Sequence, residues 1–400
     1  MQVISDNIGQ TLQHASWIRR MFEAGMELKQ RYGEDQVCDF SLGNPDLAPV
    51  PEVGRALRTL ADKVDRPMSL GYMPNAGLGT VREQLAEFLA REQQVPLTGQ
   101  QVVVTCGAAG ALNVLFRTIL GPGEEVLCPA PFFAEYDSYV GNFGGRLVPV
   151  PSKPLTFDLD TAAMEAALTE ETRAVLINSP NNPTGAVYDR ASLESLAAIL
   201  RRVSARYERP VFLVSDEPYR FLTYDNTAVP PVLPLYPYSV VVGSFSKSLS
   251  LAGERIGYMA VQPSMPERDQ LMAGLILCNR ILGFVNAPIL GQRIVEAALG
   301  ATVDVRTYRR RRDAMAGMLR DAGIEFTLPK GAFYFFPKVP GPMDDLQFCQ
   351  LLLEERILGV PGRGFGLPGH FRLAYCMDEA VILRASQGFK RAAERARSAG

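Results

Sequence analysis

Short apolar runs recur along the middle of the chain, and helix-like stretches separate most of them. An apolar run of about four to eight residues between turn formers is typical of a strand that is buried on both faces. Strands of this kind alternate with helices in mostly parallel sheets that helices cover on both sides. We therefore predict an α/β fold with strands at residues 101–105, 125–128, 146–150, 174–177, 211–214 and 239–242.

Amphipathic patterns predict helices at residues 16–32, 51–63, 78–93, 108–120, 307–322 and 379–397. Ser16 is a suitable N-cap for the first helix because its hydroxyl can accept a hydrogen bond from a free backbone N–H. After residue 295 the alternation stops, and two short strands at 333–336 and 371–375 lie between long helices. This change predicts a second, smaller α+β domain. The predicted division is a large domain at residues 46–295 and a small domain made of residues 1–45 and 296–400.

Composition and charge restrict the classes of function. The chain has 400 residues, of which 47% are hydrophobic and 21% charged, and its net charge of −2 is ordinary for a globular protein. We expect neither a nucleic acid nor a membrane as its partner, because no block of Lys and Arg lies outside the ends of the predicted helices and no apolar run could cross a bilayer. The N-terminus lacks the layout of a signal peptide.

The histidine and cysteine content also argues against a metal site. His14 and His370 are the histidines, which leaves little for histidine-based catalysis or metal binding. The cysteines have no paired spacing, so we expect buried thiols, no metal and a cytoplasmic protein. They lie at positions 38, 106, 128, 278, 349 and 376.

A lysine follows the predicted strand at residues 239–242. Ser244 comes two residues after this strand, Lys247 lies three residues later among hydroxyl residues, and Arg255 follows behind a glycine. A sheltered lysine can lose its proton and form an imine with a carbonyl cofactor. Most lysines are instead solvated at the surface, so Lys247 alone would not favour chemistry.

Other chemistry-bearing residues also follow predicted strands, where ligands bind in sheets of this class. Gly107, Ala108 and Ala109 lead from a strand into a helix, which predicts an anion site or simply a tight turn. The prolines and aromatic residues of 129–136 could cover a flat ring, although such residues more often belong to a core. The amides around Asn182 are held between prolines and could donate hydrogen bonds, or they could form only a loop.

Asp216 and Arg372 add charge to this set. Asp216 ends an apolar strand, with Tyr219 three residues later, and its carboxylate could keep a ring nitrogen protonated or could cap a helix. Arg372 lies inside an apolar strand, where an arginine needs a carboxylate partner from the protein or from a substrate.

Together these motifs resemble the class I and II aminotransferases, which are fold-type I enzymes that use pyridoxal 5′-phosphate. The resemblance runs in unbroken order from about Asp39 to Asp378. Its most specific parts are Asn181-Asn182-Pro183-Thr184-Gly185, Asp216-Glu217-Pro218-Tyr219, Ser244-Phe245-Ser246-Lys247 with Arg255, and Phe365-Gly366 with Arg372.

The resemblance implies catalytic roles for the residues after the strands. Lys247 would form the imine with the cofactor and later move a proton. Asp216 would pair with the ring nitrogen, so that the ring stays an electron sink. Tyr219 and Asn182 would bond to the phenolic oxygen, and Phe133 would stack on the ring.

The resemblance also implies how the phosphate and the substrate are held. The phosphate would be bound by the backbone of Gly107, Ala108 and Ala109 and by the side chains of Ser244 and Arg255. Tyr72 would reach the phosphate of a neighbouring subunit, which implies a homodimer with shared active sites. Arg372 would bind the α-carboxylate of an amino acid or 2-oxo acid substrate, with Gly43 beside it.

Two departures from the family pattern concern the phosphate turn and the substrate, respectively. Many members have a hydroxyl residue where this chain has Ala108 and Ala109. Dicarboxylate-specific members have an arginine in a partner-subunit loop, and Arg280 lies near that position but not on it. Arg280 could bind a distal carboxylate of the substrate, or it could form a structural ion pair at a dimer interface.

Three functions remain open on the sequence. The first is an aminotransferase with aspartate, glutamate, alanine or aromatic donors. The second is a β-elimination lyase or a synthase related to aminocyclopropane-carboxylate formation, which would share the cofactor motifs. The third is a non-catalytic effector module of a transcription regulator. The third is disfavoured because only about forty residues precede the first motif, and they contain no basic recognition helix.

Overall fold

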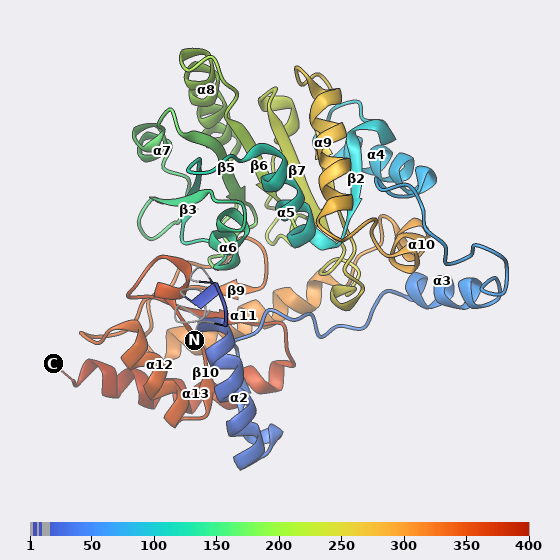
Figure 1. Cartoon of the computed structure of the whole chain (residues 1–400). Coiled ribbons are helices and arrows are strands. Elements are labelled where there is room, and N and C mark those ends of the chain that lie inside the picture. The colour runs from blue at the N-terminus through green and yellow to red at the C-terminus, as the bar shows by residue number, and fades with distance from the viewer. Residues whose placement is uncertain (1–2, 6–7, 10–16, 400) are drawn as a thin grey trace.

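Seven strands form one sheet in the computed structural model, which describes residues 3–5, 8–9 and 17–399 (Figure 1). The sheet order is β2-β8-β7-β6-β5-β3-β4. The strands are β2 (Val102–Thr105), β3 (Glu125–Ala130), β4 (Arg146–Pro151), β5 (Thr172–Asn178), β6 (Phe212–Asp216), β7 (Ser239–Ser244) and β8 (Gly257–Val261). The predicted mostly parallel α/β sheet is confirmed, and the six predicted strands are all present.

Strand β8 was not predicted. It pairs antiparallel with both β7 and β2, whereas β4, β3, β5, β6 and β7 are joined by parallel pairing. A Cβ on Gly257, at the start of β8, would lie 2.7 Å from the backbone of Gly107. Only glycine allows this close approach, which brings the end of β2 against the start of β8.

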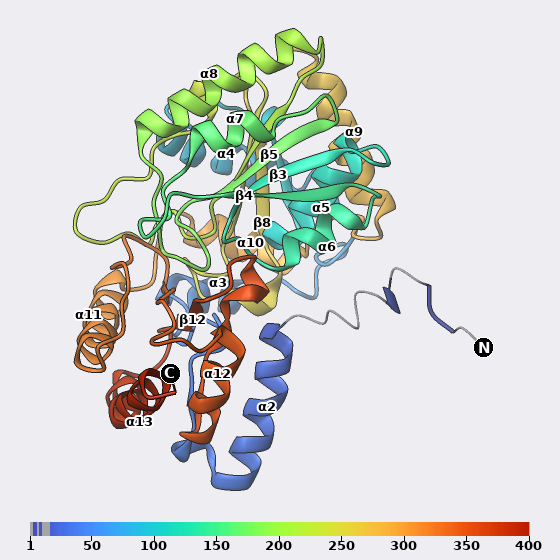
Figure 2. The ribbon, with the colours of Figure 1, turned by 90° about the vertical axis from the view of Figure 1, so that its left-hand side faces the viewer.

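Helices cover both faces of the sheet, which explains why its strands are apolar on both sides (Figure 2). One face packs on α4 (Gly79–Gln93), α7 (Thr161–Ala167) and α8 (Arg190–Arg206). The other face packs on α5 (Gly107–Ile119), α6 (Glu135–Gly141) and α9 (Arg268–Ile281). Helices α3 (Pro51–Ala61) and α10 (Ile289–Ala298) contact each other beyond β2.

A smaller α+β part lies below the sheet in Figures 1 and 2, at the other end of the molecule from α8. Its strands form a parallel pair and a three-stranded antiparallel sheet of order β11-β12-β9. The pair is β1 (Cys38–Asp39) with β10 (Ile357–Leu358), and the sheet contains β9 (Tyr334–Phe335), β11 (Val360–Pro361) and β12 (Phe371–Ala374). Its helices are α2 (Trp17–Tyr32), α11 (Val305–Asp321), α12 (Asp345–Glu354) and α13 (Glu379–Arg397).

The sequence did not predict α12, β10 and β11. The pairing of β1 with β10 joins the N-terminal segment to the C-terminal part of the chain, but the domain boundaries at residues 46 and 295 remain a prediction. Ser16, the predicted N-cap, and His14 lie outside the described residues. Within the described residues, no helix combines the length and the apolar character that a membrane span requires.

Candidate active site

A cavity of about 310 Å³ lies where β5, β6 and β7 end. Since these strands are parallel, their carboxyl ends bring the following segments to the same edge of the sheet. Most of the residues predicted for a site line this cavity. They are Gly43, Ala108, Ala109, Phe133, Asn182, Asp216, Tyr219, Ser244, Lys247, Arg255 and Arg372.

The environment of Lys247 favours its neutral amine form more than water does. Its Nζ donates a hydrogen bond to the neutral carbonyl oxygen of Gly43 at 2.7 Å and lies 5.4 Å from the centroid of the Phe333 ring. Burial lowers the pKa of Lys247 from 10.5 to about 8. About a tenth of the amine would then be neutral at pH 7, against less than about 0.1% at the ordinary pKa. Lys247 therefore has the environment that a nucleophilic lysine needs.

Asp216, the last residue of β6, has one oxygen bonded and one free. Its Oδ2 accepts a hydrogen bond from the hydroxyl of Tyr136 at 2.6 Å. Its Oδ1 is buried and has no hydrogen-bond partner from the described residues. Burial raises the pKa of Asp216 to about 7, the Tyr136 hydrogen bond opposes this shift, and the nearby charge of Glu217 adds to it. A cationic N–H donor in the cavity would satisfy both the free oxygen and the charge.

Arg372 is also incompletely satisfied. Its guanidinium lies between the rings of Tyr334 and Phe365, with centroid distances of 4.8 and 4.7 Å. Nη1 donates to Oδ1 of Asn182 at 3.1 Å and Nη2 to the carbonyl of Ser41 at 2.5 Å, while Nε has no partner among the described residues. Burial lowers the pKa of Arg372. Since both acceptors are neutral, a carboxylate from a ligand would complete the site.

The N-terminus of α5 and Arg255 form an anion cradle. Helix α5 begins at Gly107, and a Cβ there would lie 2.9 Å from Nη2 of Arg255. Gly107 also has a φ of +75°, which a side chain would disfavour. Free N–H groups of a helix end, next to a guanidinium, are suited to a phosphate. Gly107 does not line the cavity itself, but its backbone starts the helix that does.

Amide and phenol groups lie between these charged residues. The hydroxyls of Tyr219 and Tyr334 are 2.9 Å apart. Asn178 positions the amide loop, because its Nδ2 donates to the backbone carbonyl of Asp216 and its Oδ1 accepts from the backbone N–H of Asn182. Asn182 is thereby held beside both Asp216 and Arg372.

Three residues of this site were missed at the sequence level. Tyr136, Tyr334 and Asn178 line the cavity, but the sequence assigns no individual role to any of them. Tyr136 and Asn178 follow predicted strands, and this position is the signal in the sequence that places their polar atoms near the site. Tyr334 lies in a predicted strand, and nothing in the sequence indicates that its hydroxyl meets Tyr219.

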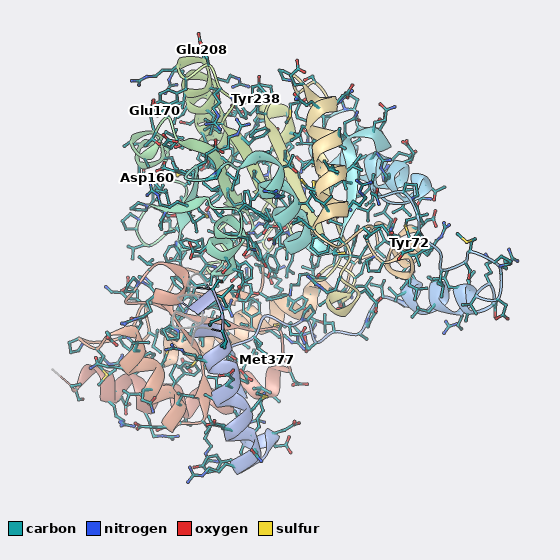
Figure 3. The ribbon with its side chains drawn as sticks, in the orientation of Figure 1. Tyr72, Asp160, Glu170, Glu208, Tyr238 and Met377 are labelled. Atoms are coloured by element: carbon teal, nitrogen blue, oxygen red, sulfur yellow. The ribbon has the colours of Figure 1, made fainter. Side chains whose placement is uncertain are left out.

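Besides Gly107, two of the predicted residues, Tyr72 and Arg280, do not line the cavity. Tyr72 is 87% exposed and lies beside α10 (Figure 3), where it lines a separate groove of about 1080 Å³. Arg280 is exposed in the last turn of α9 and does not line the cavity of its own chain.

The residues present fit pyridoxal 5′-phosphate. The free oxygen of Asp216 matches its ring N–H, the cradle at α5 matches its phosphate, and the amine of Lys247 matches its carbonyl carbon. Nε of Arg372 remains for the carboxylate of a substrate. Within residues 3–5, 8–9 and 17–399, no three His, Cys, Asp or Glu side chains gather as a metal site would require.

Comparisons with known proteins agree with this geometry. Residues 35–389 match the family model described as aminotransferase class I and II. An aspartate/prephenate aminotransferase of Thermus thermophilus is 33% identical over 383 residues, which cover 93% of this chain and 94% of that protein. A crystal structure of an amino transferase from Eubacterium rectale superposes with a TM-score of 0.94 at 35% identity, covering 99% of this chain and 100% of the other. A Thermus thermophilus aspartate aminotransferase crystallised with maleate gives 0.85 at 30% identity, covering 98% and 100%.

Proposed function

Because this chain belongs to the class I and II aminotransferases, which depend on pyridoxal 5′-phosphate, we propose that the cavity at the strand ends is its active site. An L-amino acid gives up its amino group there, and a 2-oxo acid then receives it. One observation carries the assignment. A single cavity is lined by Lys247, whose amine has a lowered pKa, by Asp216, whose Oδ1 has no partner among the described residues, and by Arg372, whose Nε has none among them either.

The charged residues divide the chemistry among them. When bound, pyridoxal 5′-phosphate supplies a carbonyl carbon that takes up the amino group and a protonated ring that withdraws electrons. Asp216 holds the ring nitrogen protonated through its free oxygen. Lys247 Nζ takes the proton from the substrate Cα, since its lowered pKa lets it act as a base near neutral pH. Arg372 orients the substrate by binding its α-carboxylate.

The remaining residues hold the cofactor in place. Arg255, Ser244 and the N–H groups at the start of α5 bind the phosphate. The hydroxyl of Tyr219 and the amide of Asn182 hydrogen-bond to the phenolic oxygen of the ring. Gly43 lies beside the substrate, and its carbonyl is the acceptor that Lys247 gives up when it reacts.

Phe133 completes the cofactor site by stacking on the ring. It lines the cavity and belongs to the same core cluster as Ala108. Phe133 would supply an aromatic face on which a flat ring can stack.

The names of the relatives suggest which substrates to test first. Several are called aspartate or aspartate/prephenate aminotransferases, so aspartate is the first donor and prephenate the first acceptor to examine. Glutamate, alanine and aromatic amino acids follow as donors, because the α-carboxylate that Arg372 binds is common to them all.

We also propose that two copies of the chain form a cytoplasmic homodimer with shared sites. Tyr72 lies exposed on a groove between α3 and α10 and does not line the cavity of its own chain. Apolar side chains on the same groove are largely exposed, as expected for a face that a second copy covers. They are Leu57, Val64, Met68, Leu70 and Leu290.

Borohydride reduction of the loaded enzyme, followed by peptide mapping, tests the site. The label should lie on Lys247, and a label on another lysine would move the site elsewhere. A screen of single amino acids then tests the reaction. An aminotransferase releases the 2-oxo acid and keeps the amino group on the cofactor, so release of ammonia would contradict the proposal.

Mixing two inactive variants tests the shared sites. Tyr72→Ala and Lys247→Ala dimers should regain activity when their subunits exchange, because half of the sites in a mixed dimer combine the two intact residues. Failure to regain activity in dimers shown to have exchanged would contradict sharing through Tyr72.

A further inference from the structure

The hydroxyl of Tyr136 makes the one side-chain hydrogen bond that the described residues give to the Asp216 carboxylate. Tyr136 lies on α6, is 1% exposed, and donates to Oδ2 of Asp216 at 2.6 Å. The two residues are 80 positions apart in sequence. Oδ1 has no partner among the described residues. One oxygen of the carboxylate is therefore bound within the protein, and the other is available to a ligand.

Other groups near Asp216 do not duplicate this bond. The side chain of Glu217 is engaged elsewhere, because it accepts hydrogen bonds from Arg220 at 2.9 Å, Gln93 at 3.0 Å and Ser215 at 2.8 Å. The titratable groups that interact electrostatically with Asp216 are Cys128 on β3, Tyr136 and Tyr139 on α6, Glu217 directly after β6, and Tyr258 on β8. Among these, Tyr136 is the hydrogen-bond donor to Asp216.

The ring of Tyr136 has a second contact in the site. It meets the Phe133 ring edge to face, with centroids 5.5 Å apart and planes at 86°. Phe133 is the residue proposed to stack on the cofactor. Tyr136 thus contacts both Asp216, which is proposed to bind the ring nitrogen of the cofactor, and Phe133, which is proposed to stack on the cofactor ring. These two contacts fix the rotamer of Tyr136.

We propose that Tyr136 is a positioning residue, whose hydroxyl keeps the Asp216 carboxylate ionised and aims its free oxygen at the ring nitrogen of the cofactor. The inference rests on the role proposed for Asp216. A phenol O–H can donate to a carboxylate but adds no charge of its own. It therefore favours the ionised acid without competing with the ring for the negative charge. An arginine or lysine at this place would neutralise the charge that the ring N–H needs.

Removal of the hydroxyl has a predictable sign. Burial already raises the pKa of Asp216 to about 7, and the Tyr136 hydrogen bond opposes that rise. In Tyr136→Phe the pKa of this carboxyl should rise further, so a larger fraction is protonated at neutral pH. Activity that requires the carboxylate is lost as pH falls through this pKa. The acid limb of the pH profile should therefore move to higher pH.

The test compares Tyr136→Phe with Tyr236→Phe in the full chain. Tyr236 is equally buried, and its hydroxyl bonds to Ser204 and to the carbonyl of Val211, away from the cavity. For Tyr136→Phe we expect the acid limb of kcat to move up by about one pH unit, kcat on that limb to fall about tenfold, and KM to change less than about threefold. Affinity of the apoenzyme for pyridoxal 5′-phosphate, followed by fluorescence titration, should fall about tenfold. Tyr236→Phe should show none of these changes.

Asp216→Asn separates this inference from the proposed function. If Asp216→Asn is impaired and Tyr136→Phe keeps the wild-type pH limb and cofactor affinity, the role of Tyr136 is refuted while that of Asp216 stands. If Asp216→Asn itself keeps wild-type turnover, the proposed site fails first. Should Tyr136→Phe not fold, 3-fluorotyrosine at position 136 gives the opposite test. Its more acidic phenol is a stronger donor and should move the acid limb to lower pH, and an unmoved limb would refute the inference.

Discussion

Replacement of Arg372 by lysine tests how the cavity binds its substrate. The guanidinium lies between two aromatic rings, and two of its donors are used on neutral oxygens of Asn182 and Ser41. A lysine keeps the positive charge but has neither the planar fork nor the stacking faces. Arg372→Lys therefore removes the planar, bidentate hydrogen-bonding group while it retains the positive charge.

The size of the effect follows from the bonds lost. A hydrogen bond to a charged group contributes about 1.5–3 kcal/mol, so loss of one of two bonds to the α-carboxylate should lower kcat/KM about 10- to 150-fold. Because every amino acid donor has an α-carboxylate, the loss should be similar for aspartate, alanine and phenylalanine. An amine without a carboxylate should be nearly unaffected.

The assay measures kcat/KM for these donors in Arg372→Lys and in a matched control, Arg312→Lys. Arg312 is also buried, stacks on the Tyr224 ring at 4.6 Å and pairs with Asp225 at 2.6 Å, but it does not line the cavity. The control should keep kcat/KM. Losses that differ strongly among donors, or an equal loss for the amine without a carboxylate, would refute the assignment of Arg372 to the α-carboxylate.

Three further predictions concern single side chains. Asp216→Ala should lower kcat much more than cofactor occupancy, measured as turnover beside absorbance of the bound cofactor, and unchanged turnover at full occupancy would leave Asp216 as a structural residue. Lys247→Met should stabilise the apoenzyme by up to about 3 kcal/mol below pH 8, because a lysine whose pKa falls from 10.5 to about 8 on folding costs stability that is recovered as pH rises between these values. Urea unfolding of variant and wild type should show a difference in free energy of unfolding that is smaller at pH 10.5 than at pH 7, and a constant difference would contradict the prediction. Arg280→Ala should lower kcat/KM for aspartate and glutamate about 10- to 100-fold and spare alanine and aromatic donors, whereas equal losses would remove Arg280 from the site.

The sheet was predictable where burial on both faces leaves a continuous apolar run. The strands β2, β3, β5, β6 and β7 have that signature, whereas the edge strand β4 alternates between buried and exposed residues; each of the six was found within a few residues of its predicted bounds. Strand β8 follows closely on the lysine and arginine motif, and no strand was predicted for its residues. Strands β1, β10 and β11 have two residues each, and pairing between distant segments defines them more than any local pattern does.

The site was predictable where chemistry follows a strand directly. Lys247 and Asp216 come after apolar runs, and the topology of a parallel sheet brings strand ends together. No comparable topological rule predicts which side chains hydrogen-bond to each other. Tyr136 meets Asp216 across 80 positions, and Tyr334 meets Tyr219 across 115 positions. Which tyrosine of the chain reaches a given acid depends on rotamers and helix placement, which the sequence pattern does not contain.

The charge balance of the cavity connects the site with the question of the substrate. Lys247, Arg255 and Arg372 are the lysine and arginine residues that line it, and Asp216 is the acid. This excess of positive charge matches a ligand pair that carries one phosphate and one carboxylate, since a phosphate alone carries about −1.5 to −2. Each of these cations already has a task in the proposed site. A second carboxylate on the donor would therefore need a positive charge from outside the described lining of this cavity. Arg280 of a second subunit is one such charge, so the donors that Arg280→Ala affects will show whether the dimer, rather than the single chain, sets the substrate class.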